Sequence, residues 1–260
     1  MLYHWIRPAL FLADAEDAHA LSLAALRMLP FPLNGVDDPI LRQNVAGLIF
    51  SNPVGLAPGY DKNAEAIEGA LRLGFGFTEV GTLTPRRQAG NDRPRLFRLR
   101  EDRAVINRMG FNNAGQASAA KRLMKLRHRT LSGPLGINIG ANKDSEDRVA
   151  DYVAGVRAME RYADYLTVNI SSPNTPGLRA LQDKSALDAL LLDVMMAREE
   201  DTPMFLKVAP DLEPADIDDI VEVTLARGVS ALIVSNTTIS RPALSSRYAN
   251  ETGGLSGAPL

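Results

Sequence analysis

Polar side chains are concentrated in the segment from Asn169 to Thr175, directly after a run of residues that reads as a buried strand. Residues 165–168 are apolar and β-prone, whereas the segment combines asparagines, serines and a threonine with prolines and a glycine beside it. Carboxamides and hydroxyls grouped in this way are suited to hold a ligand by hydrogen bonds. Of the serines in this segment, Ser171 and Ser172 are both candidates for chemistry on that ligand.

A lysine and an asparagine occur inside other apolar runs. Lys207 follows Phe205 and Leu206, and Asn138 lies between two isoleucines, near the end of its predicted strand. A charged ammonium group is costly to bury unless it meets an anion or another acceptor. Lys207 therefore either binds a ligand or forms a structural ion pair inside the fold, and the pattern leaves both interpretations open.

From about residue 46 the chain alternates predicted strands with predicted helices. The strands are expected at 54–57, 77–81, 135–139, 165–170, 204–208 and 231–235. The helices are expected at 64–73, around 148–162, at 185–198 and at 214–227. This alternation predicts a parallel sheet with helices outside it, either a doubly wound open sheet or a closed (β/α)8 TIM barrel.

In both architectures ligands bind at the carboxyl ends of the strands. The residues that follow the predicted strands are rich in polar groups, at 58–63, 82–84, 140–142, 171–174, 209–211 and 236–238. Because several independent strands end in this way, we expect one shared pocket. A TIM barrel needs eight strands, and the chain reaches Leu260 after about six, so we expect either that the last two βα units are missing or that the sheet is open.

The composition excludes several classes of function. The chain has 260 residues, of which 45% are hydrophobic and 23% charged, as in an ordinary globular protein. Its formal charge of −2, without a long basic run, argues against a nucleic-acid partner. The absence of cysteine excludes thiolate chemistry and disulfides, and His4, His19 and His128 lack metal-ligand spacing, so we expect no metal site.

The amino-terminal segment carries two apolar patterns with helical spacing. The first comprises Leu2, Trp5, Ile6, Ala9 and Leu10, and the second Ala18, Leu21, Ala25, Met28 and Leu29. They predict two short amphipathic helices ahead of residues 30–32, with no run long enough to cross a bilayer. The pair is either a lid, an anchor in the membrane interface, or a unit packed on the main domain.

A flavin fits this set of residues better than a nicotinamide does. The glycines of Gly74-Phe-Gly76 precede a strand, and Glu79 stands where a dinucleotide fingerprint needs a third glycine. A flavin ring requires hydrogen-bond donors along its pyrimidine edge and a cation near N1. These groups can come from Lys207, Asn138, Asn169 and Thr82.

Seven motifs in order resemble class 2, quinone-dependent dihydroorotate dehydrogenase over essentially the whole chain. They are Gly59–Lys62, Asn107–Asn113, Gly136–Gly140, Asn169–Gly177, Lys207–Asp211, Asn236–Thr238 and Thr252–Gly257. The resemblance implies a TIM barrel that binds FMN, spanning residues 41–260, and a membrane-facing helical pair at residues 1–40. The implied activity is oxidation of dihydroorotate to orotate in pyrimidine biosynthesis, with a quinone as the final electron acceptor.

The resemblance also implies roles for individual residues. The expected FMN contacts are Pro58, Gly59, Tyr60, Asp61, Lys62, Thr82, Asn138, Asn169, Lys207, Ser235 and Gly257. The expected substrate contacts are Lys62, Asn107, Arg108, Met109, Gly110, Phe111, Asn169, Asn174, Asn236 and Thr237. Orotate presents amide donors and carbonyl acceptors, and a carboxamide side chain can hydrogen-bond with both. The ammonium group of Lys62 would pair with the carboxylate of orotate.

Ser172 occupies the position of the catalytic base in this resemblance. The first class of the family has cysteine there, which this chain lacks entirely. Taken alone, Ser172 beside Pro173 also reads as a turn-capping serine. His19 and Arg98 match positions on the quinone side, and the implied location is the cytoplasmic face of a bacterial-type inner membrane, as a peripheral protein.

The sequence departs from the family at two cofactor positions and at its end. Pro58 and Ser235 stand where alanine and threonine are more usual, and the glycine-rich turns that hold the FMN phosphate do not precede Leu260. We therefore expect a chain ending at Leu260 to retain FMN poorly and to be inactive by itself. The alternatives are another FMN-dependent barrel oxidoreductase and an inactive fragment or scaffold without flavin.

Overall fold

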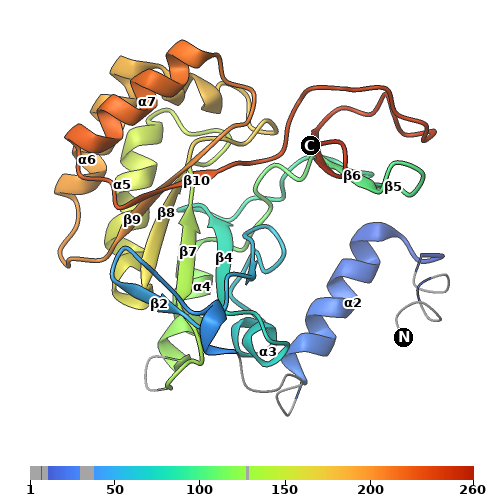
Figure 1. The fold of residues 1–260 in the computed structure, drawn as a ribbon, viewed down its shortest axis with the longest axis horizontal. Coiled ribbons are helices and arrows are strands. Elements are labelled where there is room, and N and C mark those ends of the chain that lie inside the picture. Colours follow the sequence, from blue (N-terminus) through green and yellow to red (C-terminus); the bar gives the residue numbers. More distant parts are fainter. Residues whose placement is uncertain (1–6, 8–10, 30–37, 127–128) are drawn as a thin grey trace.

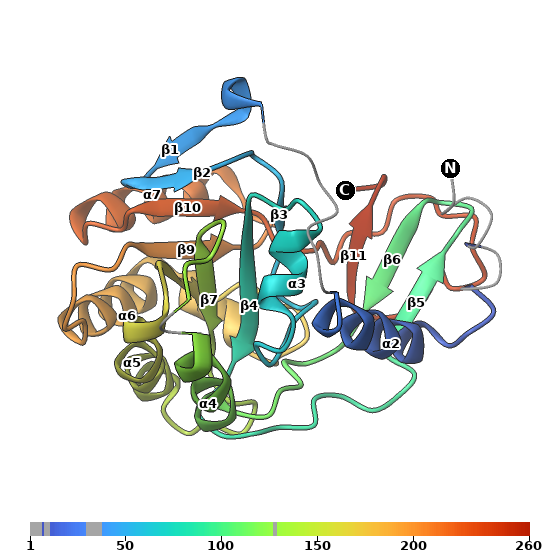
Figure 2. The ribbon, with the colours of Figure 1, turned by 90° about the horizontal axis from the view of Figure 1, so that it is seen from below.

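The computed structural model describes residues 7, 11–29, 38–126 and 129–260, and its centre is one parallel sheet (Figures 1 and 2). The six strands are β3 (Gly55–Leu56), β4 (Phe77–Leu83), β7 (Leu135–Ile139), β8 (Tyr165–Asn169), β9 (Met204–Val208) and β10 (Ala231–Val234). Each strand pairs with the next one along the chain, and the sheet curls as a half-barrel. Because the strand order never reverses, the barrel prediction is confirmed and the doubly wound sheet is wrong.

Helices connect consecutive strands and cover the outer face of the sheet. They are α3 (Ile67–Arg72), α4 (Gln116–Leu126), α5 (Arg148–Met159), α6 (Lys184–Met196) and α7 (Pro214–Ala226). Neighbouring helices from α4 to α7 contact one another, as Figure 2 shows. The short 3-10 helices are η1 (Pro39–Leu41), η2 (Glu160–Tyr162) and η3 (Leu178–Gln182). Among the described residues, all the long helices except α4 were predicted from the sequence.

Helix α7 illustrates how the sequence sets these boundaries. Pro214 occupies the first turn, where its missing N–H would be unsatisfied in any case. The backbone N–H of Glu213 donates to the Asp216 side chain at 3.0 Å and completes a capping box. Gly228 follows the helix with φ +69°, a left-handed conformation that glycine adopts without strain.

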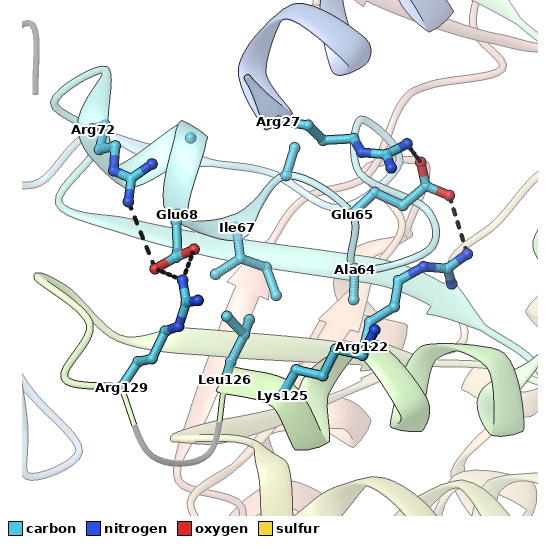
Figure 3. A pocket seen from close by; sticks show the side chains of 12 residues that line it. Arg27, Ala64, Glu65, Ile67, Glu68, Arg72, Arg122, Lys125, Leu126 and Arg129 are labelled. Atoms are coloured by element: carbon cyan, nitrogen blue, oxygen red, sulfur yellow. Dashed lines mark hydrogen bonds and ion pairs between the residues drawn. The ribbon is translucent and has the colours of Figure 1, made fainter. Parts of the chain in front are cut away.

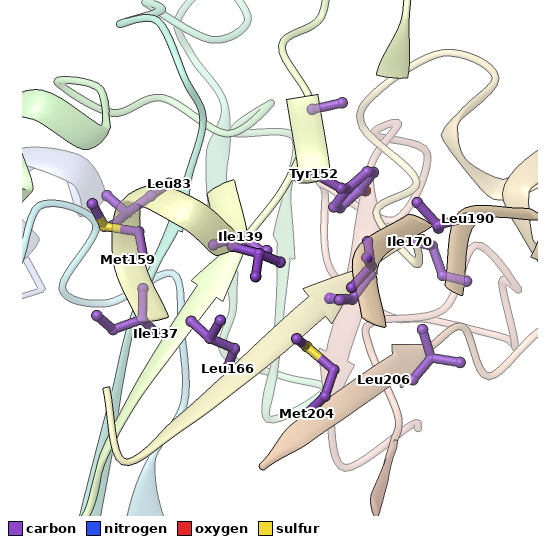
Figure 4. Packing of buried hydrophobic residues seen from close by; sticks show 14 of the residues in the cluster. Leu83, Ile137, Ile139, Tyr152, Met159, Leu166, Ile170, Leu190, Met204 and Leu206 are labelled. Carbon is purple, nitrogen blue, oxygen red and sulfur yellow. The ribbon is translucent and has the colours of Figure 1, made fainter. Parts of the chain in front are cut away.

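The outward side chains of the strands form the main core against the helices (Figure 4). Ile137, Ile139, Leu166, Met204 and Leu206 are fully buried there. Side chains alternate along a strand, so the residues between them point to the inner face. The inner face carries Asn138 and Lys207, the polar residues that occur inside apolar runs of the sequence.

An aromatic cluster fills the amino-terminal end of the half-barrel. The hairpin of β1 (Gln43–Val45) and β2 (Leu48–Phe50), absent from the sequence predictions, brings Phe50 to this end. Phe50 meets Phe77 edge-on at a ring-centroid distance of 5.0 Å, and Tyr165 stacks on Phe205 at 4.6 Å. With this end filled by aromatic rings, the space for a ligand lies at the carboxyl end of the strands.

A second, antiparallel sheet lies beside the half-barrel and was not predicted from the sequence. It comprises β5 (Leu96–Leu99), β6 (Ala104–Asn107) and β11 (Gly254–Gly257), in the order β11-β6-β5. An isolated bridge between Thr238 and Leu255 ties β11 to the segment after β10. This sheet therefore delivers residues from distant parts of the chain to one side of the strand exits.

Helix α2 (Ala15–Arg27) packs against α3 and β5 and confirms the second predicted amphipathic helix. Its amino end is capped by Asp14, and Glu16 is ion-paired with Arg95 at 2.6 Å. The first predicted helix, 2–10, and the segment 30–32 lie outside the described residues except for Arg7. Among the described residues, none of the helices is both long and apolar enough to span a membrane.

Candidate active site

A cavity of about 630 Å³ opens at the carboxyl ends of the parallel strands. This is the size of a site for a small organic ligand or cofactor. The residues predicted for the cofactor that line it are Pro58, Gly59, Tyr60, Lys62, Thr82, Asn169, Lys207 and Ser235. The residues predicted for the substrate that line it are Lys62, Asn107, Met109, Gly110, Phe111, Asn169, Asn174, Asn236 and Thr237. Ser172 and His19 line it as well.

The loop after β3 is shaped by a buried carboxylate. Asp61 accepts hydrogen bonds from the backbone N–H groups of Glu65 and Ala66, at 2.8 Å and 2.7 Å for its Oδ2. Gly59, with φ +101°, donates its N–H to the Gly81 carbonyl at 2.7 Å. Asp61 thus holds the loop in place from behind and does not line the cavity.

Lys62 projects from this loop into the cavity, where its Nζ donates to the carbonyl of Gly59. Burial lowers the pKa of Lys62 to about 8. No ion pair involves Lys62 within the described part of the chain. An anionic ligand entering the cavity would therefore restore a favourable partner for this ammonium group.

The floor of the cavity is a network of buried side chains from three strands. Thr82 Oγ1 donates to Asn138 Oδ1 at 2.6 Å. Asn169 Nδ2 donates to Thr82 Oγ1 at 3.0 Å and to Asn138 Oδ1 at 3.1 Å. Asn138 lies one layer below the cavity lining, so it fixes the orientation of Thr82 and Asn169.

Lys207 is the buried cation of the inner face. It is 8% exposed, pairs in register with Asn169 on the neighbouring strand and lines the cavity. No hydrogen bond or ion pair joins its Nζ to another residue across the described ranges. Burial lowers the pKa of Lys207, and the charge of Glu79 opposes that shift. An unpaired buried ammonium beside a cavity is the observation that fits a bound, electron-rich ring.

Ser172 lies in the segment after β8 and is 4% exposed. Its Oγ accepts the backbone N–H of Asn174 at 3.3 Å, the contact expected of a turn-capping serine. Within the described residues neither a carboxylate nor an imidazole hydrogen-bonds Ser172. Thr175 Oγ1 is buried nearby in the sequence and has no hydrogen-bond partner among the described residues.

Several carboxamide groups line the cavity together with Lys62. Asn174 Nδ2 donates to the carbonyl of Asn107 at 3.2 Å. Asn236 Nδ2 donates to Ser171 Oγ at 2.9 Å, and Ser171 Oγ donates to Asn169 Oδ1 at 2.8 Å. These bonds hold the asparagines in place while leaving further donor and acceptor capacity for a ligand.

Arg179 joins the segments that follow three strands and was missed as a site residue. Its Nη1 lies 2.9 Å from Asp211 Oδ2, its Nε donates to the Ser171 carbonyl at 3.1 Å, and its Nη2 donates to the Thr237 carbonyl at 3.3 Å. Arg179 thereby orders the segments that carry Ser172 and Asn236. The sequence shows only that an arginine follows the predicted strand 165–170, and its partners after two other strands appear only in the structure.

Arg108 and Gly257 do not line the cavity. Arg108 forms an ion pair with Glu251 at 2.6 Å, and its guanidinium lies 4.6 Å from the centre of the Phe97 ring. Gly257 ends β11 with φ +106° and lies against the backbone of Arg103. Both residues organise the antiparallel sheet, whose Ser256, Val105 and Leu96 were not predicted but do reach the cavity.

His19 and Arg98 are separated in the structure. His19 Nε2 lies 2.7 Å from the Tyr60 carbonyl oxygen, and burial, followed by the charge of Lys62, lowers the pKa of His19. Arg98 Nη1 donates to the Ala13 carbonyl at 3.0 Å, and the central carbon of its guanidinium lies 4.7 Å from the centre of the Phe11 ring. Only His19 therefore faces the cavity.

A smaller cavity of about 350 Å³ between α2, α3 and α4 is lined by charged residues (Figure 3). Glu65 is paired with Arg27 and Arg122 at 3.4 Å each, and Glu68 with Arg129 at 2.6 Å. None of the predicted site residues lines it. These ion pairs tie the helices together. The described ranges also contain no cluster of residues that could hold a metal ion.

Comparisons with known proteins agree with this geometry. The family model for dihydroorotate dehydrogenase matches residues 40–260. A dihydroorotate dehydrogenase (quinone) of Sphingopyxis alaskensis is 63% identical over 99% of this chain and 73% of its own length. One of Erythrobacter litoralis is 60% identical over 100% of this chain and 76% of its own length. The crystal structure of DHODH from Eimeria tenella in complex with ferulenol has a TM-score of 0.90 and 42% identity, over 95% of this chain and 73% of its own.

Proposed function

The chain belongs to the dihydroorotate dehydrogenase family, and from this premise we propose that it oxidises dihydroorotate to orotate, with a quinone as final electron acceptor. The observation that carries the proposal is the single cavity in which Lys62, Lys207, Ser172 and the asparagines meet. The reaction is a step of pyrimidine biosynthesis. The family is flavin-dependent, and we assign FMN as the flavin of this protein.

Lys207 supports the assignment of FMN, because a buried, unpaired ammonium suits the pyrimidine end of an isoalloxazine ring. Thr82 and Asn169 would bind the same edge, oriented from below by Asn138. Bound flavin supplies the acceptor for the hydride that leaves C6 of dihydroorotate. In this proposal Asp61, Arg108 and Gly257 act by positioning the loops around the site.

The substrate is proposed to lie between Lys62 and the asparagines. Lys62 would pair with the carboxylate, and Asn107, Asn174 and Asn236 would bind the amide and carbonyl groups of the pyrimidine ring. Met109, Gly110, Phe111 and Thr237 complete the lining of this part. An ion pair and several carboxamides together fix the plane of the ring, which orients C5 and C6 for reaction.

Ser172 is proposed as the base that removes the proton from C5. Its hydroxyl is buried at the cavity wall without a dedicated partner base, so the proton must pass onward through water or another hydroxyl. Thr175 carries the nearest hydroxyl in the sequence that has no hydrogen-bond partner among the described residues.

The quinone and membrane sides are the remaining parts of the proposal. We assign residues 1–40 to the membrane- and quinone-facing segment and 41–260 to the FMN-binding domain, at the cytoplasmic face of the membrane. His19 supports this because it projects from α2 into the cavity. Leu21 of α2 and Met28, which follows the helix, are 67% and 81% exposed, as expected of an apolar stripe that enters a membrane interface. Arg98, with its contacts to Phe11 and Ala13, would act on this side indirectly.

The function is tested by mixing the purified full-length protein with dihydroorotate and a soluble quinone and following orotate formation. We expect orotate to form in proportion to quinone reduced, with bound FMN released on denaturation. A different FMN barrel oxidoreductase would carry flavin but leave dihydroorotate unchanged. A scaffold without catalysis would show neither flavin nor turnover, and either result would overturn the proposal.

Orotate binding is expected to weaken as the pH rises above about 8. Burial lowers the pKa of Lys62 to about 8, so its positive charge is present below that pH and lost above it. The dissociation constant should increase about tenfold per pH unit beyond that point until the pKa of the bound state is reached. Titrations of orotate between about pH 6.5 and pH 9.5 measure this.

The matched control for this pH dependence is Lys62→Arg, because a guanidinium keeps its charge throughout this range. The variant should bind orotate with an affinity that varies little with pH. If Lys62→Arg showed the same loss above pH 8, the titrating group would be another residue.

A further inference from the structure

Glu79 is a buried acidic residue that takes no part in the proposed reaction. It lies on β4 and is 3% exposed, on the inner face of the half-barrel below the cavity floor. Burial strongly disfavours a charged carboxylate unless hydrogen bonds or an opposite charge compensate for the lost water. Neither a dinucleotide site nor a metal cluster explains its presence, so Glu79 requires another role.

Both carboxylate oxygens of Glu79 have donors, one on the adjacent strand β7 and one on β8. Asn138 Nδ2 donates to Oε1 at 2.7 Å, and the Tyr165 hydroxyl donates to Oε2 at 3.1 Å. Gly136 makes the second bond possible, because a Cβ at that position would overlap the Tyr165 ring. Two donors, one on β7 and one on β8, therefore hold the carboxylate in one orientation.

The same network leads from Glu79 to the residues around Lys207. Asn138 Oδ1 accepts a hydrogen bond from Asn169 Nδ2. Asn169 in turn is the register partner of Lys207 on β9. Among the described residues, Glu79 is the charged group that acts electrostatically on Lys207. The other titratable group beside Glu79 is Tyr165, and burial raises the pKa of its phenol, which keeps it neutral.

We propose that Glu79 is the buried counter-charge of the Lys207 ammonium group, and so a positioning residue that sets the charge next to the flavin ring. The two charges stabilise each other across the floor of the site without forming a contact pair. Because no direct ion pair ties up Lys207, its N–H donors stay available for a ligand in the cavity. The part of this inference that concerns flavin rests on the function proposed above, whereas the coupling between the two residues does not.

The pKa values of the two residues support this coupling. Burial raises the pKa of Glu79, and the Asn138 hydrogen bond and the charge of Lys207 act in the opposite direction. Burial lowers the pKa of Lys207, and the charge of Glu79 again acts in the opposite direction. Removing either charge should therefore move the other residue further toward its neutral form.

The test is the titration of Lys207 in flavin-free protein, followed by NMR of the lysine side chains and assigned by the signal lost in Lys207→Met. In Glu79→Gln, which keeps the shape of the side chain, we expect the Lys207 pKa to fall by about one unit or more. Glu160→Gln is the matched control. Glu160 is also 3% exposed, but it accepts the backbone N–H groups of Glu199 and Glu200 at 2.8 Å and 3.3 Å, away from the cavity.

A second measurement covers the case in which Glu79→Gln does not fold. Coupling between two sites is reciprocal, so Lys207→Met should raise the pKa of the Glu79 carboxyl by the same amount. With flavin bound, the pH at which its absorbance and reduction potential change should shift downward in Glu79→Gln. Equal Lys207 titration in Glu79→Gln and Glu160→Gln, or an unmoved Glu79 in Lys207→Met, would overturn the inference. If the coupling is found but FMN does not bind, the function proposed above is at fault.

Discussion

Ser172→Ala is expected to lower the rate of flavin reduction by dihydroorotate by about 10²- to 10⁴-fold, the usual contribution of a general base. Ser172 lines the cavity beside the proposed substrate groups, and alanine removes only its hydroxyl. The fold should tolerate the change, because the lost contact is one hydrogen bond from Asn174, worth about 1 kcal/mol. Stopped-flow absorbance of the flavin in single turnovers measures the rate without interference from the quinone step.

Two further measurements separate a catalytic hydroxyl from a turn-capping one. Orotate affinity should change little in Ser172→Ala, since the hydroxyl acts on a proton and not on binding. Ser172→Cys should recover part of the rate, with a pH profile that follows the thiol. If the alanine variant reduced flavin within about twofold of the original rate, less than any general-base contribution, Ser172 would be only a turn cap.

The regular parts of the fold were predictable because the spacing of apolar residues agreed with the glycine and proline residues that mark the ends of elements. The strands at 135–139 and 204–208 match β7 and β9 at both ends. In β7, Leu135, Ile137 and Ile139 alternate with Gly136 and Asn138, which reflects a sheet with one face against helices and one face toward a site. Gly228 and Pro214 marked the two ends of α7 in the same local way.

The antiparallel sheet could not be predicted in this way, because its strands are short and β11 is far from the other two in the sequence. β6 and β11 pair Ala104–Asn107 with Gly254–Gly257, and neither segment has a long apolar pattern. Pairing at such a separation depends on tertiary packing, here on Leu255 and Ile106 in a small core of their own. The hairpin of β1 and β2 was missed because each of its strands has only three residues, too few to show an alternating pattern.

Most of the site residues could be predicted from the resemblance. The residues that hold them in place are apparent only from the structure. Lys62, Asn174 and Lys207 were expected at one place, and they line one cavity. Sequence could not reveal that Arg179 ties the strand exits together or that Gly136 leaves room for a tyrosine, because these depend on which residues become neighbours across strands. The role of a residue in the site depends on its contacts, and the register of the strands determines those contacts.

Lys207→Met is expected to weaken FMN binding by about 10- to 100-fold. A hydrogen bond from a charged donor contributes about 1.5–3 kcal/mol, and each 1.4 kcal/mol changes the dissociation constant tenfold. The lost cation should also lower the reduction potential of the bound flavin, because a positive charge near N1 stabilises the reduced anion. Titration of flavin-free protein with FMN, and a redox titration of the complex, measure the two effects. Lys184→Met is the control, since Lys184 is an exposed residue paired with Glu222 at 2.7 Å.

The stability of the flavin-free protein distinguishes this role from a structural ion pair. If Lys207 served mainly to hold the fold through a contact pair, its removal would cost about 3–5 kcal/mol by leaving a buried charge without its partner. Here Lys207 has no contact partner among the described residues, and Glu79 can take up a proton when the ammonium is lost. Methionine also removes the cost of burying the ammonium, which offsets the lost attraction. Chemical denaturation should therefore show a change of less than about 1 kcal/mol, small beside the 3–5 kcal/mol of a broken pair. A large loss of stability with unchanged FMN affinity would show that Lys207 belongs to the scaffold and not to the cofactor site.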